Sequence, residues 1–383
     1  MGGGWILLSA GEASGDLLGA ELATELKRRT PDLELAGMGG DRMAAAGVAL
    51  AVQARDVAVV GLTEALARLP RLWRAYRLLV GMLRDPRPDL LLCIDFPEFN
   101  LRLARAAARV GVPVCYYVSP QIWAWRRGRI RTLRRLVRRM LVIFPFEEAL
   151  YREAGVPVRF VGHPLLDRVQ AVPSREVCRA RLGLLGGERL IGLLPGSREA
   201  EVRRHLPVMA EAAARIGTAL PGTRFAVAVA DTVAPERLTP LVPSDLRAAI
   251  RLVTGDTYGV IRAAELVIAA SGTVTLEAGV LGTPLVVIYK VSPLTYLAGR
   301  LLIRVPFIGM VNLVAGRQVA PELIQGAATP ERIAAEALSL LRDPTRLAAV
   351  RAELARLPGL LGEGGAPGRA AEAVLACLAE ARR

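Results

Sequence analysis

A single acidic side chain, Asp95, stands where a parallel sheet can use it for chemistry. It follows the apolar run 90–94, which is predicted to be a buried strand. Open α/β sheets bind and transform their ligands at the carboxyl ends of such strands. Pro97 interrupts regular structure two residues later, so we expect Asp95 to lie in a loop that faces a crevice. The alternative is that Asp95 caps a helix over residues 100–110.

A loop rich in glycine and serine follows the first predicted strand, residues 5–9. This loop, residues 10–16, contains Glu12 and Ser14 and opens a predicted helix over residues 16–29. Backbone N–H groups in such a loop are suited to hold an anion. The alternative is that the glycines serve only the geometry of the turn, as in many Rossmann-like domains.

A second anion site is predicted in the stretch 266–289, which reads as strand, turn, helix and strand. The turn is Ser271-Gly272-Thr273. It would leave free N–H groups and the positive end of a helix dipole at the end of a strand, where an anion settles. Glu277 lies on the same helix face, so it is placed to accept a ribose hydroxyl while the turn holds phosphate. The alternative is that Glu277 is only favoured by the dipole.

Two further side chains are candidates for ligand contact. Arg198 ends a turn after the predicted strand 190–194 and stands at the start of a helix. The dipole disfavours a cation there unless an anion is bound, so a phosphate contact competes with an exposed arginine. His163, one of two histidines, lies at a bend after residues 158–161. It is a candidate ligand, although a structural hydrogen bond is the commoner role.

Positive charge dominates the sequence. Lys and Arg total 50 against 36 Asp and Glu, which gives a net charge of +14, and only two of the cations are lysines. Eight arginines fall within residues 126–139 with no acid among them, so they repel one another unless an anion lies against them. Nucleic acid, a bilayer surface and a phosphorylated lipid fit this run, and a solvated helix face is the alternative. Residues 62–84 predict either two helices separated at Pro70 or a basic amphipathic surface.

Composition argues against several classes of protein. Hydrophobic residues make up 52% of the 383, yet no window of eighteen lacks charged or turn residues, so no transmembrane helix is expected. No basic segment precedes the first strand, so we expect no secretory signal and a cytoplasmic location. Four scattered cysteines, two histidines and the lack of CxxC and DxD motifs argue against a metal site. No cofactor is expected.

Two halves of similar size repeat the pattern of strand, turn and helix. The economical architecture is an α/β fold of two Rossmann-like domains that face each other across a cleft. We place the first domain at residues 1–170 and the second at residues 171–345. Helices over residues 346–383 are expected to return, through a glycine-rich joint at 359–368, to the first domain or to a partner subunit.

Seven motifs in order resemble the lipid-A-disaccharide synthase family. They are AGEASGD (10–16), IDFPEFN (94–100), YYVSPQIWAWR (116–126), FVGHPL (160–165), LLPGSREAEV (193–202), ASGTVTLEAG (270–279) and NLVAGRQVAPELIQ (312–325). The resemblance implies the GT-B fold and an inverting hexosyl transfer. It implies that 2,3-diacylglucosamine passes from UDP to the 6-hydroxyl of 2,3-diacylglucosamine 1-phosphate (lipid X), which releases UDP and forms the β-1,6 disaccharide of lipid A.

The resemblance also implies roles for residues. Asp95 matches the family's essential aspartate and would take the proton of the acceptor hydroxyl, and Glu12 matches a second required position. Arg198 and the turn Ser271-Gly272-Thr273 would stabilise the departing UDP without metal, with Glu277 at the uridine ribose. The remaining candidate substrate-binding residues are Asn312, Glu322, Gln325, Ser14 and His163.

Partners are expected from these substrates. Acyl chains prefer lipid by ~0.8 kcal/mol per buried CH₂, so the UDP-diacylglucosamine donor and the lipid X acceptor imply an enzyme held peripherally at the anionic surface of the inner membrane. A homodimer is compatible with the joint at 359–368, and nucleic acid is not an expected partner.

One alternative function is that of another GT-B enzyme of UDP-sugars, such as the muramyl-pentapeptide N-acetylglucosaminyltransferase or a UDP-N-acetylglucosamine epimerase. Another is a non-catalytic protein that binds nucleic acid through the arginine run.

Overall fold

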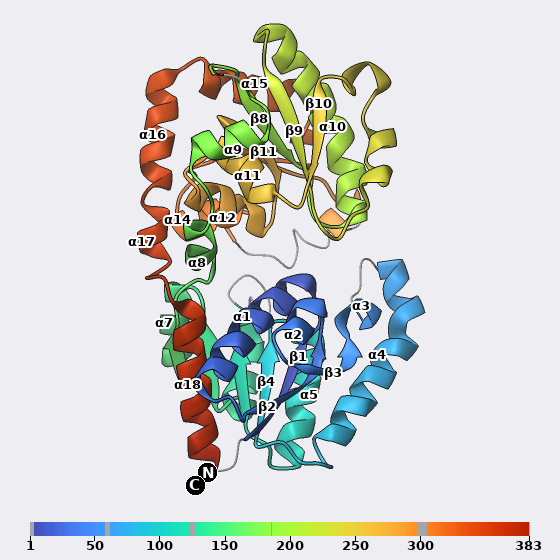
Figure 1. The fold of residues 1–383 in the computed structure, drawn as a ribbon, viewed down its shortest axis with the longest axis vertical. Helices are drawn as coiled ribbons and strands as arrows, with labels where there is room; N and C mark the ends of the chain where they lie inside the picture. Colours follow the sequence, from blue (N-terminus) through green and yellow to red (C-terminus); the bar gives the residue numbers. More distant parts are fainter. Residues whose placement is uncertain are drawn as a thin grey trace. The chain divides into compact units, whose positions relative to one another are not determined.

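The chain folds into two compact α/β units (Figure 1). The structure is a computed structural model, and it describes residues 4–57, 62–120, 122, 127–184, 186–293, 295–297 and 305–382. Unit 1 comprises Met1–Pro164 and Leu361–Arg383, and unit 2 comprises Leu165–Leu360. Each unit is built on its own parallel sheet, as the sequence predicted.

Unit 1 has a parallel sheet with the strand order β3-β2-β1-β4-β5-β6-β7 over the described residues. Its strands are β1 (Trp5–Ala10), β2 (Glu34–Gly39), β3 (Ala49–Gln53), β4 (Leu90–Ile94), β5 (Val114–Tyr117), β6 (Arg139–Val142) and β7 (Val158–Phe160). Its helices are α1 (Ala13–Arg29), α2 (Asp41–Ala45), α3 (Ala54–Val57), α4 (Leu62–Met82), α5 (Pro97–Arg109), α6 (Ile130–Leu136), α7 (Pro145–Glu153) and α18 (Ala366–Ala381). The chain runs outward in opposite directions from β1 and β4, so the loops after these two strands flank a switch point where such sheets bind ligands.

Unit 2 has a parallel sheet with the order β10-β9-β8-β11-β12-β13 over the described residues. Its strands are β8 (Leu190–Leu194), β9 (Arg224–Val229), β10 (Ile250–Thr254), β11 (Leu266–Ala270), β12 (Leu285–Tyr289) and β13 (Glu322–Ile324). Its helices are α8 (Leu165–Gln170), α9 (Arg175–Arg181), α10 (Glu199–Ala219), α11 (Thr257–Ala263), α12 (Thr273–Val280), α14 (Met310–Ala315), α15 (Pro330–Leu341), α16 (Pro344–Leu354) and α17 (Leu357–Leu360). The switch point of this sheet lies between β8 and β11.

Both faces of the unit 2 sheet are buried. Alternate residues of one strand enter different cores: Ile191 and Leu193 pack in the cluster that includes α10 and α15, whereas Leu190 and Leu194 pack in the cluster that includes α11 and α12. A strand covered by helices on both sides is apolar at every position. This is why the short unbroken apolar runs in the sequence mark strands.

Two prolines act differently from the sequence-based expectation. Pro70 lies inside a single helix, α4, so the prediction of two helices over residues 62–84 is wrong. A proline inside a helix costs about 3 kcal/mol, and burial of Leu79 and Leu83 from the same segment offsets that cost. Pro97 starts α5 instead of delaying it, because the first helical position needs no N–H donor.

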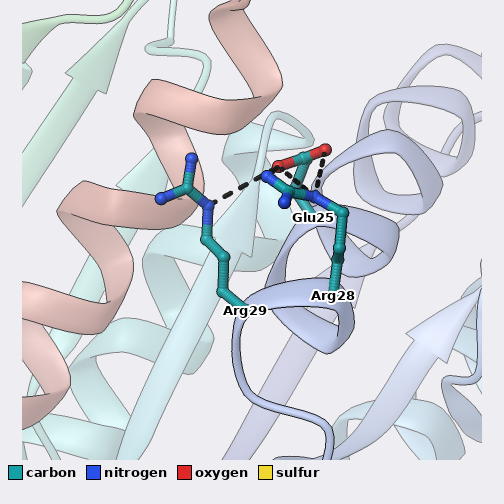
Figure 2. A network of polar contacts seen from close by, with 3 residues as sticks. All are labelled: Glu25, Arg28 and Arg29. Carbon is teal, nitrogen blue, oxygen red and sulfur yellow. Dashed lines mark hydrogen bonds and ion pairs between the residues drawn. The ribbon is translucent and has the colours of Figure 1, made fainter.

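The C-terminal helix α18 belongs to unit 1, where it packs on α1. Figure 2 shows Arg28 and Arg29 of α1 both reaching Glu25, with Arg28 Nη2 at 2.8 Å from Glu25 Oε2. Gly368 of α18 lies against this group, since a Cβ there would come within 3.3 Å of Arg29 Nη2. Arg369, the next residue, donates to the carbonyl oxygens of Val161 (2.9 Å), Glu363 (2.6 Å) and Gly364 (2.6 Å).

Within the described ranges, no helix is both long enough and apolar enough to cross a membrane. The exposed apolar side chains of α4 include Leu69 and Trp73, which are 52% and 60% exposed. Trp73 stacks on Tyr76, with 5.6 Å between their ring centroids. The outer face of α4 is therefore amphipathic.

We expect Arg369→Ala to lower the free energy of unfolding of unit 1 by roughly 2–3 kcal/mol, because three charged hydrogen bonds are lost, one that joins α18 to Val161 after β7 and two to the loop before α18. Urea unfolding followed by circular dichroism measures the change. Arg28→Ala is the control, since it removes only an exposed pair within one helix. Equal effects of the two substitutions would contradict the assigned role of Arg369.

Candidate functional site

The loop after β4 holds Asp95 in an unusual backbone conformation. Asp95 and Phe96 both have positive φ, 47° and 49°, which costs a non-glycine residue about 1–3 kcal/mol. Hydrogen bonds to the neighbouring strand hold this turn: Asp95 N donates to Tyr117 O (3.0 Å), and the Tyr116 hydroxyl donates to Asp95 O (2.7 Å). The sheet therefore fixes the position of Asp95.

Asn100 joins this loop to the neighbouring strand β1. Its side chain is fully buried. Its amide nitrogen lies 3.0 Å from Ser9 O, 3.3 Å from Ile94 O and 2.7 Å from Asp95 O, and it shares its two N–H groups among these acceptors. The hydroxyl of Ser9 donates to Asn100 Oδ1 (2.6 Å). One amide thus ties the ends of the two strands at the switch point.

Gly11 brings the loop after β1 against the loop after β4. A Cβ at Gly11 would lie 2.2 Å from Cδ1 of Phe96, so the Phe96 ring occupies the place of a side chain there. Glu12, the next residue, is half-buried and precedes the first residue of α1. The absent side chain at Gly11 is what lets the two loops approach.

The environment of Asp95 favours its neutral form. Burial and, second, the negative charge of Glu12 raise the pKa of Asp95 to about 6, against a hydrogen bond from the Phe96 N–H that lowers it. The effect of Glu12 shows that the two carboxylates are near neighbours. At neutral pH most Asp95 side chains remain ionised and able to accept a proton.

Other loops at the same edge of the unit 1 sheet are polar. Glu147 is buried and accepts hydrogen bonds from the Ser119 hydroxyl (2.6 Å) and from Phe144 N (3.3 Å). His163 is also buried, with its ring centroid 5.1 Å from that of Phe144, and its backbone N donates to the carbonyl oxygen of residue 361 (3.0 Å). Ser14 lies exposed in the first turn of α1.

The arginine run is partly paired with acids from distant parts of the chain. Arg129 contacts Glu98 (2.6 Å), and Arg139 contacts Glu380 of α18 (3.0 Å). Residues 123–126, including Arg126, lie outside the described part of the chain. Folding therefore brings acids of the same chain to part of this run, and contact of the run with an external anion stays a prediction.

In unit 2 the turn Ser271-Gly272-Thr273 follows β11 at the switch point and opens α12. Ser271 N donates to Ile288 O (2.9 Å), and its hydroxyl donates to Ile308 O (2.7 Å). Gly272 and Thr273 are exposed. Since the first N–H groups of a helix have no acceptor within it, this turn presents donors and the positive end of the α12 dipole to a ligand.

Glu277 lies one turn into α12 within a polar group that the sequence did not reveal. The Tyr258 hydroxyl donates to Glu277 Oε1 (3.2 Å). Burial raises the pKa of Glu277, while the positive charge of Arg168 and the hydrogen bond from Tyr258 oppose that rise. Arg168 comes from α8 and Tyr258 from α11, so no local spacing could have indicated either residue.

Arg198 precedes α10, in the loop after β8. It is exposed, with its Nη1 3.6 Å from Glu201 Oε1. Beneath it, the buried His205 joins two loops: Lys290 N donates to His205 Nε2 (3.0 Å), and Nδ1 lies 2.9 Å from Pro195 O. Because Nε2 accepts, Nδ1 must carry the proton and donate, which makes the ring neutral. Burial lowers the pKa of His205 and favours this form.

Asn312, Glu322 and Gln325 direct their polar atoms at the backbone of unit 2. Asn312 Oδ1 accepts from the N–H groups of residues 319 and 320 (2.7 and 2.9 Å), and its amide donates to Glu322 Oε1 (2.8 Å). Glu322 also accepts from the N–H groups of residues 308 and 309. Gln325 makes two bonds to Val291, as acceptor (2.7 Å) and donor (3.1 Å). Substrate contact by these three residues stays a prediction.

The two groups of residues suit different tasks. The edge of unit 1 offers a carboxylate with a raised pKa beside a second carboxylate, which suits proton transfer. The edge of unit 2 offers backbone donors, an arginine and a buried glutamate, which suit a phosphate and a sugar hydroxyl. Among the described residues, no group of three or more His, Cys, Asp and Glu side chains is placed to hold a metal ion.

We expect Asn312→Ala to lower the free energy of unfolding of unit 2 by roughly 2–4 kcal/mol, because it leaves the buried N–H groups of residues 319 and 320 without this acceptor and removes one donor to Glu322. Urea unfolding measures the change. The control is Thr218→Ala on the exposed face of α10, where we expect less than about 0.5 kcal/mol. A small effect at Asn312 would show that water replaces its hydrogen bonds.

Comparison with known sequences gives matches over nearly the whole chain. A family model described as lipid-A-disaccharide synthetase matches residues 6–357. The lipid-A-disaccharide synthase of Syntrophus aciditrophicus is 50% identical over 366 residues, 96% of this chain and 96% of the relative. That of Myxococcus xanthus is 48% identical over 377 residues, 98% of each chain.

Solved structures similar to this one share its two-sheet architecture. A putative UDP-N-acetylglucosamine 2-epimerase from Listeria monocytogenes has a TM-score of 0.67 and 15% identity, over 100% of this chain and 98% of that one. A glycosyltransferase of kitacinnamycin has a TM-score of 0.63 and 18% identity, over 98% and 99%. At such low identity the likeness shows the fold alone. The predicted α/β GT-B class is confirmed.

Proposed function

Since the chain belongs to the lipid-A-disaccharide synthase family, we propose that its two switch points divide the work of one glycosyl transfer between them. The chain is a glycosyltransferase, as its motifs predicted. The donor is UDP-2,3-diacylglucosamine and the acceptor is lipid X. The products are UDP and the β-1,6-linked disaccharide 1-phosphate of lipid A.

One observation supports proton transfer by unit 1: the sheet holds Asp95 beside Glu12, and the pKa of Asp95 is raised to about 6. We assign Asp95 as the general base. As the 6-hydroxyl oxygen of the acceptor attacks the anomeric carbon, its proton passes to Asp95, and the bond from that carbon to the UDP oxygen breaks with its electron pair. The attack from the opposite side inverts the anomeric centre. We assign Glu12 to orientation of the acceptor.

Unit 2 is assigned to the nucleotide. The N–H groups of Gly272 and Thr273, the α12 dipole and Arg198 would stabilise the charge that gathers on UDP as it leaves. Glu277 would accept a ribose hydroxyl, in a place set by Tyr258. No step of this scheme requires a metal ion.

The remaining candidates have supporting roles in this proposal. Glu322 holds the backbone N–H groups of residues 308 and 309, and the Asn312 amide donates to Glu322. The Ser271 hydroxyl bonds to the same segment. We assign them as positioning residues for the anion-binding turn, and Gln325 as the positioning residue for Val291. Ser14 and His163 are assigned to the acceptor, because both lie at the carboxyl edge of the unit 1 sheet.

The acylated substrates place the reaction at a membrane surface. The outer face of α4, where Leu69, Trp73 and Leu78 are exposed, would rest on anionic lipid. Exposed arginines of the run 126–139 would contact the same lipid. We assign acceptor binding to residues 1–170 and donor binding to residues 171–345. A cytoplasmic enzyme at the inner membrane fits these assignments, and a homodimer stays a prediction.

Release of UDP tests the proposal directly. Purified protein is mixed with UDP-2,3-diacylglucosamine and lipid X, and both UDP and the disaccharide 1-phosphate are measured. We expect the two products in equal amounts. UDP-N-acetylglucosamine is the control donor, and its turnover in place of the acylated donor would favour another GT-B enzyme and contradict the proposal.

The rate should depend on pH through Asp95. Only the deprotonated carboxylate accepts a proton, so we expect kcat/KM to fall about tenfold per pH unit below pH 6 and to level off above it. Glu12→Gln removes the negative neighbour, lowers the pKa of Asp95 and moves this fall to lower pH. Glu34→Gln, at an exposed site at the start of β2, is the control and should leave the profile in place. An unmoved profile in Glu12→Gln would remove Glu12 from the site.

Substitutions in the two units should separate turnover from nucleotide binding. We expect Asp95→Asn to reduce kcat by about 10²–10⁴-fold with the Kd for UDP unchanged. We expect Glu277→Gln to raise the Kd for UDP about tenfold, because a charged hydrogen bond is weakened. Isothermal titration calorimetry with UDP measures the Kd of each variant, and the UDP-release assay measures kcat. Loss of UDP binding in Asp95→Asn would reassign that residue.

A further inference from the structure

A small pocket lies at the opposite edge of the unit 2 sheet, away from the anion-binding turn. Its volume is about 110 Å³. Arg175 of α9, Arg262 of α11 and Arg351 of α16 line it, together with the turn at residues 281–284 that leads into β12. The five residues of β11 separate this edge from Ser271, which is roughly 13 Å at the rise of a parallel strand.

Three guanidinium groups meet in this pocket without a carboxylate partner. In the part of the chain that the structure describes, none of them forms an ion pair with Asp or Glu, although most other ion pairs of this protein involve arginine. All three side chains are half-buried. Burial and, next, the positive charges of Arg351 and Arg179 lower the pKa of Arg175, and the negative charges of Glu265 and Glu176 only partly oppose this. The charges therefore repel one another in a place where water screens them poorly.

Arg262 carries a buried donor that nothing satisfies. Its Nη1 donates to Leu281 O (3.3 Å) at the end of α12. Its Nε is buried and has no hydrogen-bond acceptor among the described residues. Buried donors without a partner are rare, and this one leaves part of the positive charge of Arg262 uncompensated within the described residues.

A purely structural role accounts for only part of this arrangement. An arginine beside the last carbonyl of a helix is favourable by itself, which explains one nitrogen of Arg262. It does not explain why Arg175 and Arg351, from two other helices, lie at the same pocket. A ligand with several acceptor oxygens and negative charge accounts for all three.

We propose that this pocket binds a phosphate group. Guanidinium groups present paired donors that match the oxygens of phosphate, and three of them can neutralise a dianion. The volume is below the roughly 300 Å³ at which pockets begin to hold larger organic ligands, so a nucleotide does not fit. Bound phosphate joins α9, α11 and α16 to the turn before β12 and stabilises unit 2.

Thermal unfolding of the full chain tests the proposal. Sodium phosphate is compared with sodium chloride at equal ionic strength, and saturating UDP is present throughout to occupy the nucleotide site. We expect phosphate to raise Tm in a saturable way, since a ligand that binds only the folded state stabilises it. Arg351→Ala should weaken the apparent affinity at least about tenfold, and Arg262→Lys, which keeps the charge and loses the paired donors, should weaken it several-fold.

Two control variants distinguish this pocket from other sites. Arg332→Ala, on the exposed side of α15, and Arg198→Ala, at the nucleotide turn, should keep the full response to phosphate. A response that appears only when UDP is left out, or that is lost in Arg198→Ala, would place the phosphate at the nucleotide turn and overturn the proposal. If Arg351→Ala does not fold, Arg262→Lys takes its place. The ³¹P line broadening of free phosphate then compares phosphate binding by the native chain and by this variant.

The phosphate group can come from solution or from a phospholipid headgroup. Flotation with phosphatidylcholine vesicles that contain phosphatidic acid tests the second source, again in the native chain and in Arg262→Lys. A saturable rise in Tm identifies free phosphate, and flotation that depends on Arg262 identifies the headgroup. Absence of both effects, or effects unchanged in Arg262→Lys, would refute the site.

Discussion

The buried amide of Asn100 is the interaction on which the proposed chemistry of unit 1 depends. Strands β1 and β4 are paired at the switch point, but the loops that follow them leave in opposite directions and have no ladder hydrogen bonds to each other. Asn100 supplies the missing connection, because it bonds to Ser9 on one strand and to Ile94 and Asp95 on the other. Together with the bonds to Tyr116 and Tyr117, these bonds hold the left-handed turn at Asp95.

In unit 2 a different side chain, that of His205, links the loops that follow the strands. His205 bonds to Pro195 after β8 and to Lys290 after β12, so one neutral imidazole spans loops on both sides of β11. In both units a fully buried polar residue on a helix reaches back to the ends of strands. Such residues set the positions of the loops that carry the candidate ligand-binding side chains. A buried network of this kind is costly when one of its polar groups lacks a partner.

Much of the architecture was predictable because both faces of each sheet are covered. Runs such as 266–270 and 190–194 are apolar at every position, and their turns contain glycine, so β11, β8 and the start of α12 followed from local pattern. β3 and β13 were not predicted, because Ala49–Gln53 has no fully buried residue and Glu322–Ile324 is very short. The prediction of a helix break at Pro70 was wrong, because the packing of α4 outweighs the low helix propensity of proline.

The candidate site was predictable only where chemistry coincides with a strand end. Asp95, Glu12 and the turn at Ser271 stand at such positions. Arg168 and Tyr258 affect Glu277 from two other helices, and pairing at that distance depends on tertiary structure. The acids that meet the arginine run show the same limit: Glu380 reaches Arg139 only because α18 returns to unit 1.

That return has a consequence for how the chain is made. Residues 165–360 form a complete body, whereas the first unit lacks a layer until residues 366–381 have been synthesised, since α18 covers α1 and buries Val374 and Cys377. Unit 1 therefore cannot complete its fold until the end of the chain has been synthesised, although its first residues leave the ribosome earliest. Until then it exposes the apolar surface that α18 will cover.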